Sequence, residues 1–256
     1  MSAPLLEVRG LSNHFGSVCT ARDLSLSFAE GELTSVIGPN GAGKSTFINL
    51  LTGHLPVQAG QVLFRGRDVT GLAVHQRVRL GMGRSFQIAN VFPGLTVLEN
   101  VLIPALALAG RAGRPLSRIS GEREAREQAQ GVLSRVGLGA EAERPASALS
   151  HGDRRLLEVA VALASRPALL FLDEPTAGMN PVERTRLLEG IRALSAGGQT
   201  TFVLVEHDMD VVFALSARVV VLHRGELLCD GPPERVRADA RVREVYLGHE
   251  VEEAAP

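Results

Sequence analysis

The chain has 256 residues, of which 45% are hydrophobic and 21% are charged. These values are typical of a soluble globular protein, and they exclude a wholly disordered chain or a coiled coil. The formal net charge is -1, and the sequence shows no polybasic footprint of the kind that binds nucleic acid or anionic lipid.

The cysteines and the apolar runs indicate the cellular compartment of such a chain. Cys19 and Cys229 lie far apart and lack the spacing of a zinc site, so they predict neither a disulfide framework nor a metal centre. The longest apolar run, residues 101–110, is about half of the roughly 20 residues that a membrane span needs. The first residues do not have the pattern of a signal peptide. We expect a protein of the reducing cytosol whose own chain crosses no membrane.

The first elements in chain order form a strand, loop and helix unit. Short apolar runs at residues 5–8, 24–28 and 33–37 predict strands, with turn residues between them. After Ile37 the sequence becomes rich in glycine, and apolar residues at helical spacing then predict a helix that ends at Gly53.

The glycine-rich segment Gly38-Pro39-Asn40-Gly41-Ala42-Gly43-Lys44-Ser45 fits the eight-residue phosphate loop. Backbone N–H groups at a helix start must converge on phosphate oxygens, and a Cβ at Gly41 or Gly43 would obstruct that approach. Lys44 then meets the β- and γ-phosphates, and Ser45 ligates Mg²⁺. The alternative is an accidental glycine-rich turn, against which the preceding strand and the following helix argue.

Helical periodicity with few strand signals follows from about Gln87 to Arg166, which predicts a helical subdomain. Strands return further on and alternate with helical stretches, so we expect an α/β protein with a mostly parallel sheet. The predicted strands are 169–172, 201–205 and 219–222, and the helices between them are 181–195 and 208–215.

Two carboxylates end the apolar run at residues 169–172. A central strand that delivers acids to a phosphate site has this form: Asp173 suits the magnesium shell, and Glu174 suits the attacking water. The same pair could instead cap the next helix. His207 follows another buried run at the edge where ligands of open α/β sheets bind, although a histidine in that position can also be purely structural.

These segments together resemble the ATP-binding subunit of ABC transporters over nearly the whole chain. Leu149-Ser150-His151-Gly152-Asp153 is similar to the family signature, usually Leu-Ser-Gly-Gly-Gln, and stands just before the acidic strand. Gln87 matches the glutamine loop, and residues 177–180 fall at the aspartate loop. Phe15, before Gly16, falls where an aromatic ring stacks on adenine, although the residue type alone favours an ordinary core aromatic, because aromatic side chains mostly serve packing.

The resemblance implies ATP and Mg²⁺ as cofactors and assigns a role to each motif. Glu174 would polarise the attacking water and His207 would contact the γ-phosphate, with Lys44 and Gln87 as further catalytic residues. Ser150 and Gly152, at a helix start that favours anions, would serve the nucleotide of a partner subunit. The expected magnesium ligands are Ser45, Gln87 and Asp173, and the expected nucleotide-binding residues are Phe15, Gly38, Pro39, Asn40, Gly41, Ala42, Gly43, Lys44, Ser45, Thr46, Ser150 and Gly152.

The resemblance also implies the ABC ATPase fold. This fold is an α/β P-loop NTPase core with a mostly parallel sheet, an N-terminal antiparallel β segment and an inserted α-helical subdomain. The expected boundaries are 1–86 for the first part of the core, 87–166 for the helical subdomain, 167–238 for the second part of the core, and 239–256 for a short C-terminal helix and tail.

Three residues depart from the family pattern. His151 and Asp153 differ from the usual residues of the signature, and Asn180 replaces the usual loop aspartate. These three differences affect the expected contacts with the partner subunit. Asp153 adds a negative charge near an incoming γ-phosphate, and its place in the first helical turn offers compensation of about 0.3–1 kcal/mol from the helix dipole. His151 is expected to be a solvated or hydrogen-bonded loop histidine.

Several arginines could be mistaken for a nucleic-acid patch. Acidic residues such as Glu99 and Glu122 flank them, so we expect a solvated surface of mixed charge. These arginines are Arg77, Arg79, Arg84, Arg111 and Arg114.

Within the family, the chain resembles importers of branched-chain amino acids and related amides or urea. Residues 92–100, 206–209 and 246–248 carry this likeness. It implies an ATPase that dimerises on ATP at the cytoplasmic face of the cell membrane and drives separate membrane permease subunits. The expected partners are those subunits, a second ABC ATPase subunit, which is either a homologous chain or a second copy of this one, and, indirectly, a solute-binding protein, with no nucleic acid.

Two alternatives remain. A soluble ABC ATPase acting in translation or DNA maintenance would usually carry paired cassettes or basic and coiled-coil insertions, which this sequence lacks. A phosphate-loop kinase would lack the Ser150-His151-Gly152 element, and a module that binds without hydrolysing should lack Glu174.

Overall fold

The computed structural model describes residues 3–85, 91–108 and 123–253. They form two compact units: the first unit is Met1–Arg77 with Thr201–Pro256, and the second unit is Val78–Thr200. Gln87, the predicted glutamine-loop residue, lies outside the described residues.

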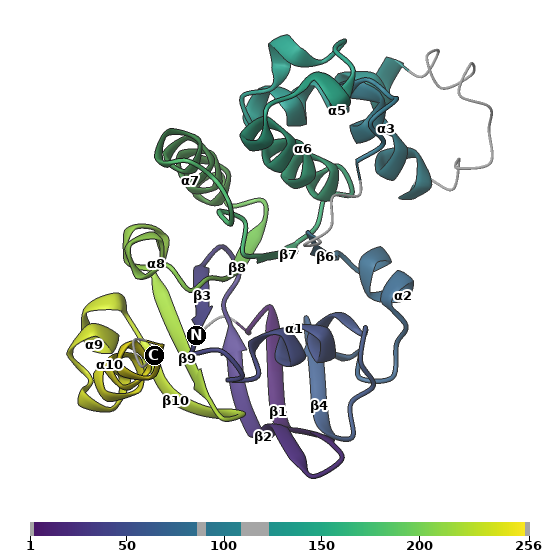
Figure 1. Cartoon of the computed structure of the whole chain (residues 1–256). Coiled ribbons are helices and arrows are strands. Elements are labelled where there is room, and N and C mark those ends of the chain that lie inside the picture. The colour runs from purple at the N-terminus through teal and green to yellow at the C-terminus, as the bar shows by residue number, and fades with distance from the viewer. Residues whose placement is uncertain (1–2, 86–90, 109–122, 254–256) are drawn as a thin grey trace. The chain divides into compact units, whose positions relative to one another are not determined.

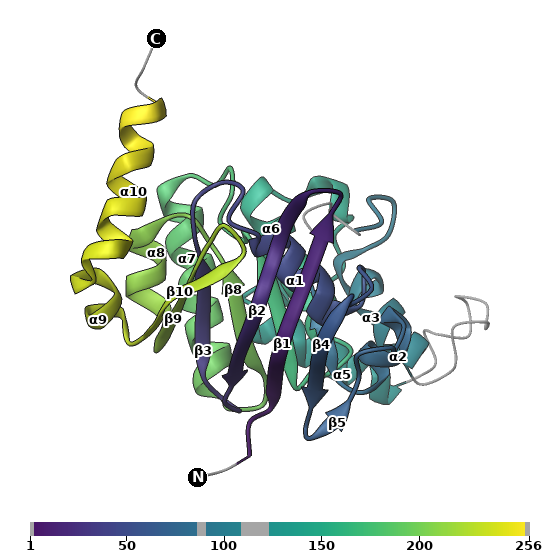
Figure 2. The same ribbon diagram turned by 90° about the horizontal axis from the view of Figure 1, so that it is seen from below.

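The N-terminal strands of the first unit form an antiparallel sheet in the order β2-β1-β4-β5. Figure 2 shows β2, β1 and β4 side by side. In β1, Leu6 is paired with Phe28 on one side and Phe64 on the other, and all three side chains are buried. The strands are β1 (Leu6–Phe15), β2 (Val18–Phe28), β4 (Ala59–Phe64) and β5 (Arg67–Asp68).

A second set of strands in the first unit is mostly parallel. β3 (Leu33–Ile37) pairs in parallel with both β8 (Thr201–Val205) and β9 (Arg218–His223), and β10 (Glu226–Gly231) pairs antiparallel with β9. Every residue of β3 and β8 is buried, as expected for parallel strands covered on both faces.

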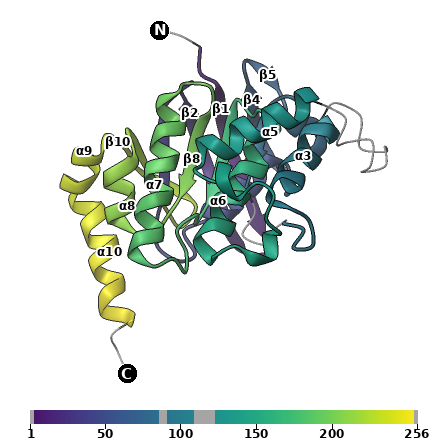
Figure 3. The same ribbon diagram turned by 90° about the horizontal axis from the view of Figure 1, so that it is seen from above.

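The C-terminal helices of the first unit pack against these strands through one apolar cluster. Figure 3 shows these helices next to β10. Ile37 and Val221 from the strands meet Val236 and Val242 from the helices. α10 reaches Glu253, so the C-terminal helix is longer than the short helix that the sequence suggested. The helices are α8 (Met209–Leu215), α9 (Pro233–Ala238) and α10 (Ala240–Glu253).

The prediction of a solvated surface is wrong for Arg77, which is only 2% exposed. Its guanidinium donates to the carbonyl oxygens of Leu50 (2.8 Å) and Leu51 (2.6 Å) near the end of α1 (Lys44–Thr52). A buried cation at a helix C-terminus satisfies carbonyls that have no partner within the helix. Arg77 belongs to α2 (Val74–Arg79) and therefore helps to anchor the helix that follows the phosphate loop.

The second unit combines a short parallel strand pair with helices (Figure 1). β6 (Met82–Arg84) pairs in parallel with β7 (Leu169–Asp173), all of whose residues are buried. Its helices α3, α5 and α6 contribute fully buried side chains such as Val97, Leu133 and Leu157. The helices are α3 (Val97–Leu108), α5 (Arg123–Arg135), α6 (His151–Leu163) and α7 (Pro181–Ala196).

The predicted fold class is confirmed. The chain is α/β, with mostly parallel strands and an antiparallel N-terminal sheet. The helices α3, α5 and α6 are inserted in the sequence between β6 and β7. None of the helices in the described residues is both long and apolar enough to cross a membrane.

Candidate functional site

The phosphate-loop sequence forms a loop between β3 and α1 in the first unit. Gly38 is buried at the end of β3, and Asn40, Gly41 and Ser45 are exposed. α1 begins at Lys44, with Gly43 as its N-cap in a left-handed conformation and no side chain capping it. Backbone N–H groups at this helix start are therefore available to an anion.

Two glycines of the loop are required by packing as well as by phosphate access. A Cβ at Gly38 would lie 2.2 Å from the carbonyl oxygen of Leu222, and one at Gly43 would lie 2.4 Å from the carbonyl oxygen of Thr20. At Gly41 a Cβ would meet no atom within 4 Å, but φ is +76°. The loop backbone thus packs directly on β2 and β9, and only at Gly41 is the surrounding space open.

Lys44 folds back over the loop that it ends. Its Nζ donates to the carbonyl oxygens of Gly38 (2.5 Å) and Pro39 (3.1 Å). These oxygens hold the ammonium against the loop backbone, and a bound phosphate would offer it charged oxygens in place of these neutral carbonyls. A hydrogen bond from the ammonium to a charged phosphate oxygen is stronger than one to a neutral carbonyl oxygen. Lys44 can therefore exchange the carbonyls for a bound phosphate.

Two more segments of the first unit support the loop. The turn between β9 and β10 donates a hydrogen bond from the Gly225 N–H to the carbonyl of Ala42 (3.0 Å). From α10, the buried Tyr246 hydroxyl has no hydrogen-bond partner in the described residues. Burial raises the pKa of Tyr246, and the nearby backbone N–H of Gly38 acts in the opposite direction. The C-terminal helix thus reaches the start of the phosphate loop.

Phe15 and His207 are both exposed in the first unit. Phe15 ends β1 and is 51% exposed, so it is not the core aromatic that the residue type alone allowed. An exposed aromatic ring at a strand end is available for stacking. His207 follows β8 in the segment before α8, directly after Glu206, which is fully buried.

In the second unit, Asp173 ends β7 and Glu174 follows it. Asp173 is buried, whereas Glu174 is half-buried and has φ of +45°. A residue other than glycine in the left-handed region is strained, and such residues concentrate at functional sites. Glu174 does not cap α7, because that role falls to Asn180, so the capping alternative is excluded.

Arg84, another residue predicted to be solvated, is instead half-buried, and its side chain lies beside Asp173. Its Nη2 donates to Asp173 Oδ2 at 2.8 Å, with side-chain exposures of 12% and 5%. The sequence did not indicate this pair, because the two residues meet only through the pairing of β6 with β7.

The signature segment begins α6, and Ser150 is its N-cap. Ser150 Oγ accepts from the Asp153 N–H (3.1 Å) and donates to Asp153 Oδ2 (3.0 Å). Asp153 also accepts from Arg186 of α7 through Oδ1 (2.7 Å), and Arg186 donates further to the Gly137 carbonyl (2.9 Å). Arg186, which the sequence analysis missed, compensates the charge of Asp153 in addition to the helix dipole.

A second missed residue, Glu183, joins the signature to the start of α7. Its carboxylate accepts from the Gly152 N–H (3.1 Å) and from the Asn180 N–H (3.3 Å), while Asn180 Oδ1 accepts from the Glu183 N–H (3.0 Å). Asn180 and Glu183 form a capping box. Asparagine, in place of the usual loop aspartate, therefore caps the N-terminus of α7. The spacing of Asn180 and Glu183, three residues apart with Pro181 between them, is the local sequence signal that could have predicted this capping box.

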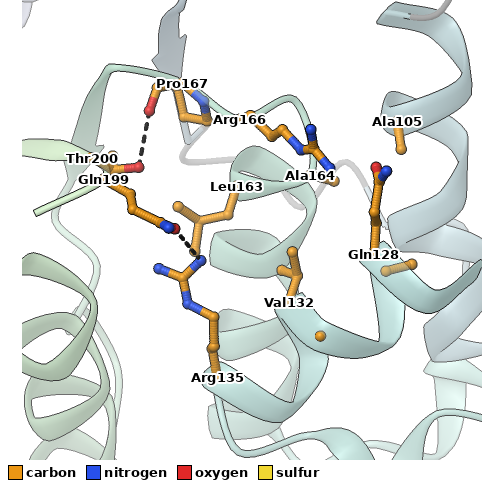
Figure 4. A pocket seen from close by; sticks show the side chains of 12 residues that line it. Ala105, Gln128, Val132, Arg135, Leu163, Ala164, Arg166, Pro167, Gln199 and Thr200 are labelled. Carbon is orange, nitrogen blue, oxygen red and sulfur yellow. Dashed lines mark hydrogen bonds between the residues drawn. The ribbon is translucent and has the colours of Figure 1, made fainter. Parts of the chain in front are cut away.

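The second unit contains a cavity of about 480 Å³, and none of the motif residues is among those that line it (Figure 4). Leu163, Val132 and Ala129 form part of its apolar wall, and Arg135 donates to Gln199 (3.2 Å) at its edge. Its lining residues come from α3, α5, α6 and the segments before β7 and β8, so it is not part of the candidate nucleotide site.

Comparisons with known proteins agree with this set of motifs. A family model described as ABC transporter matches residues 21–177, which include the phosphate loop, the signature and both acids. A second model, described as branched-chain amino acid ATP-binding cassette transporter, matches residues 226–252, from β10 into α10.

Curated relatives match along almost their entire length. The chain is 40% identical to the high-affinity branched-chain amino acid transport ATP-binding protein LivG of Salmonella typhimurium, over 97% of this chain and 99% of the relative. Identity and coverage are the same for the corresponding protein BraF of Pseudomonas aeruginosa.

Solved structures give the same result. A nucleotide-free ATP-binding cassette from an ABC transporter superposes with a TM-score of 0.83 at 31% identity, covering 95% of this chain and 99% of that one. An ATP-binding cassette in its ADP conformation superposes with a TM-score of 0.84 at 30% identity, covering 96% and 100%.

Proposed function

Because the chain belongs to the ABC transporter family as one of its ATP-binding cassettes, we propose that it hydrolyses ATP to drive import of branched-chain amino acids through separate membrane subunits. The observation that carries the solute class is the match of residues 226–252 to the branched-chain amino acid cassette model. That segment lies outside the general cassette match, so it distinguishes this branch from other transporters.

The nucleotide roles rest on the motif residues. Lys44 holds the β- and γ-phosphates over the exposed N–H groups at the start of α1, and Phe15 offers its exposed ring to the adenine. Glu174 polarises the attacking water, and His207 contacts the γ-phosphate. Asn40, Gly41, Ala42 and Thr46 line the phosphates with backbone groups or with the Thr46 hydroxyl.

The residues present fit Mg²⁺. Ser45 and Asp173 provide hydroxyl and carboxylate oxygens, the donors that Mg²⁺ prefers, and Gln87 would add an amide oxygen. No group of three or more His, Cys, Asp or Glu side chains that could hold a metal exists among the described residues. Mg²⁺ is usually held by one or two protein groups together with waters and substrate phosphates. When bound, the ion neutralises charge on the phosphates.

The signature of this chain serves a partner cassette. Ser150 and Gly152 stand at the first turn of α6, where a partner's γ-phosphate would be favoured by the helix dipole. Their donors now point to carboxylates of the chain itself, so a phosphate would have to replace Asp153 and Glu183 there. We expect the partner to be a second, related cassette, and the pair to work at the cytoplasmic face of the membrane.

Reconstitution tests this function. The tagged chain is purified from membranes of its own source, and the membrane subunits that accompany it are identified by mass spectrometry. The assembly is placed in lipid vesicles with ATP, and uptake of labelled leucine is compared with uptake of a labelled sugar. Leucine uptake that needs ATP supports the proposal. Purification with ribosomes or DNA instead of membrane subunits would contradict it and favour the soluble alternative.

A further inference from the structure

Arg84 is fixed next to the predicted magnesium ligand by the backbone of the second unit. β6 and β7 run parallel with Arg84 opposite Phe171, and the Ser85 N–H donates to the Phe171 carbonyl at 2.9 Å. This register places the guanidinium beside the end of β7, where Nη2 donates to Asp173 Oδ2 at 2.8 Å.

The pair is well shielded from water, with side-chain exposures of 12% for Arg84 and 5% for Asp173. Charges in such surroundings act on each other more strongly than they would in bulk water. A divalent cation bound to Asp173 would stand close to the positive guanidinium, and the two cations would repel each other. Arg84 therefore satisfies the Asp173 carboxylate and also opposes a metal ion there.

We propose that Arg84 is a positioning residue: it is the internal counter-cation of Asp173, and it weakens the hold of this carboxylate on Mg²⁺ so that the ion binds only together with the ATP phosphates. The inference rests on the proposed function, in which Asp173 is a magnesium ligand. The phosphates supply the negative charge that outweighs Arg84. After the γ-phosphate leaves, the guanidinium favours release of the ion with the product.

A purely structural ion pair predicts something different. If Arg84 only ties β6 to β7, its removal changes the stability of the protein and leaves the metal's contribution to nucleotide binding as it was. The quantity that separates the two cases is the metal coupling factor, defined as the Kd for ATP in EDTA divided by the Kd for ATP with saturating Mg²⁺.

The experiment measures this factor by titrating the full chain with fluorescent MANT-ATP. Arg84→Gln keeps hydrogen-bond donors but removes the charge, and Arg84→Lys keeps the charge. We expect the factor to rise about tenfold in Arg84→Gln, equivalent to about 1.4 kcal/mol, and to stay within about twofold of wild type in Arg84→Lys. In an Asp173→Asn background, Arg84→Gln should leave the factor unchanged, because the effect acts through that carboxylate.

Thermal melts identify any variant that does not fold, and Arg84→Met then serves as the second neutral substitution. An unchanged or lower factor in a folded neutral variant would overturn the inference, because Arg84 would then not oppose the metal. A wild-type protein whose ATP affinity does not respond to Mg²⁺ would count against the proposed function itself.

Discussion

Arg186 Nη1 donates to Asp153 Oδ1 at 2.7 Å, and this bond gives the unusual signature carboxylate a cation of its own. The pair joins α7 to the first turn of α6, because Asp153 lies in that turn, where it also binds the N-cap residue Ser150. Asp153 therefore enters the signature as one half of a neutralised pair, and the repulsion toward a γ-phosphate is smaller than its charge alone would give.

Arg186→Ala should remove the cation that neutralises the negative charge of Asp153. Because Arg186 is 51% exposed, we expect a stability loss of no more than about 1 kcal/mol. ATP turnover of the assembled cassette pair should fall about fivefold, equivalent to about 1 kcal/mol in the barrier. The measurement is a double-mutant cycle with Asp153→Asn, which should restore turnover. Equal losses with Asp and with Asn at 153 would mean that the two side chains act independently.

Gly38→Ala should destabilise the protein by at least about 2 kcal/mol, because the new Cβ would collide with the Leu222 carbonyl oxygen, 2.2 Å away. Gly41→Ala is the matched control, since it has open space around it and carries only the cost of a left-handed alanine, about 1–2 kcal/mol. Urea unfolding of both variants provides the comparison. A larger loss at Gly41 than at Gly38 would show that packing on β9 does not shape the loop.

These same residues show which structural features can be predicted from the sequence and which cannot. The strand before Gly38, the helix that begins at Lys44 and the two acids at the end of β7 are local patterns, and each lies where the spacing predicted. The partners Arg84–Asp173 and Arg186–Asp153 lie far apart in the sequence and meet through strand pairing or helix packing, which no local pattern encodes. Arg77 was misjudged for the same reason: its charge suggested solvent, but carbonyls of α1 and of the chain before α2 surround it.

Lys44→Ala should remove useful ATP affinity, because it deletes the cation at the β- and γ-phosphates. It also deletes the bonds to the Gly38 and Pro39 carbonyls, so a thermal melt must accompany the binding titration. Lys44→Arg is the control that keeps the charge. Normal ATP binding by a folded Lys44→Ala chain would mean that the phosphate site is elsewhere.

Ser150→Arg places a bulky cation at the N-cap of α6 and should block the signature toward a partner's nucleotide. If this chain pairs with itself, mixing Ser150→Arg with Lys44→Ala should restore at most one composite site per dimer. Turnover of each variant alone and of the mixture gives the answer. Full activity of the Ser150→Arg chain on its own would exclude a role for Ser150 across the interface.

The most direct test of the account is ATP turnover by Glu174→Gln. Glutamine keeps the size of the side chain at this strained position, φ +45°, and removes the charge that would polarise the attacking water. We predict that turnover of the assembled cassette pair falls at least about a hundredfold, while MANT-ATP remains bound and the ATP-dependent pair accumulates in size-exclusion chromatography. Turnover equal to that of the wild-type chain would contradict the assignment of Glu174 and, with it, the central claim of the site.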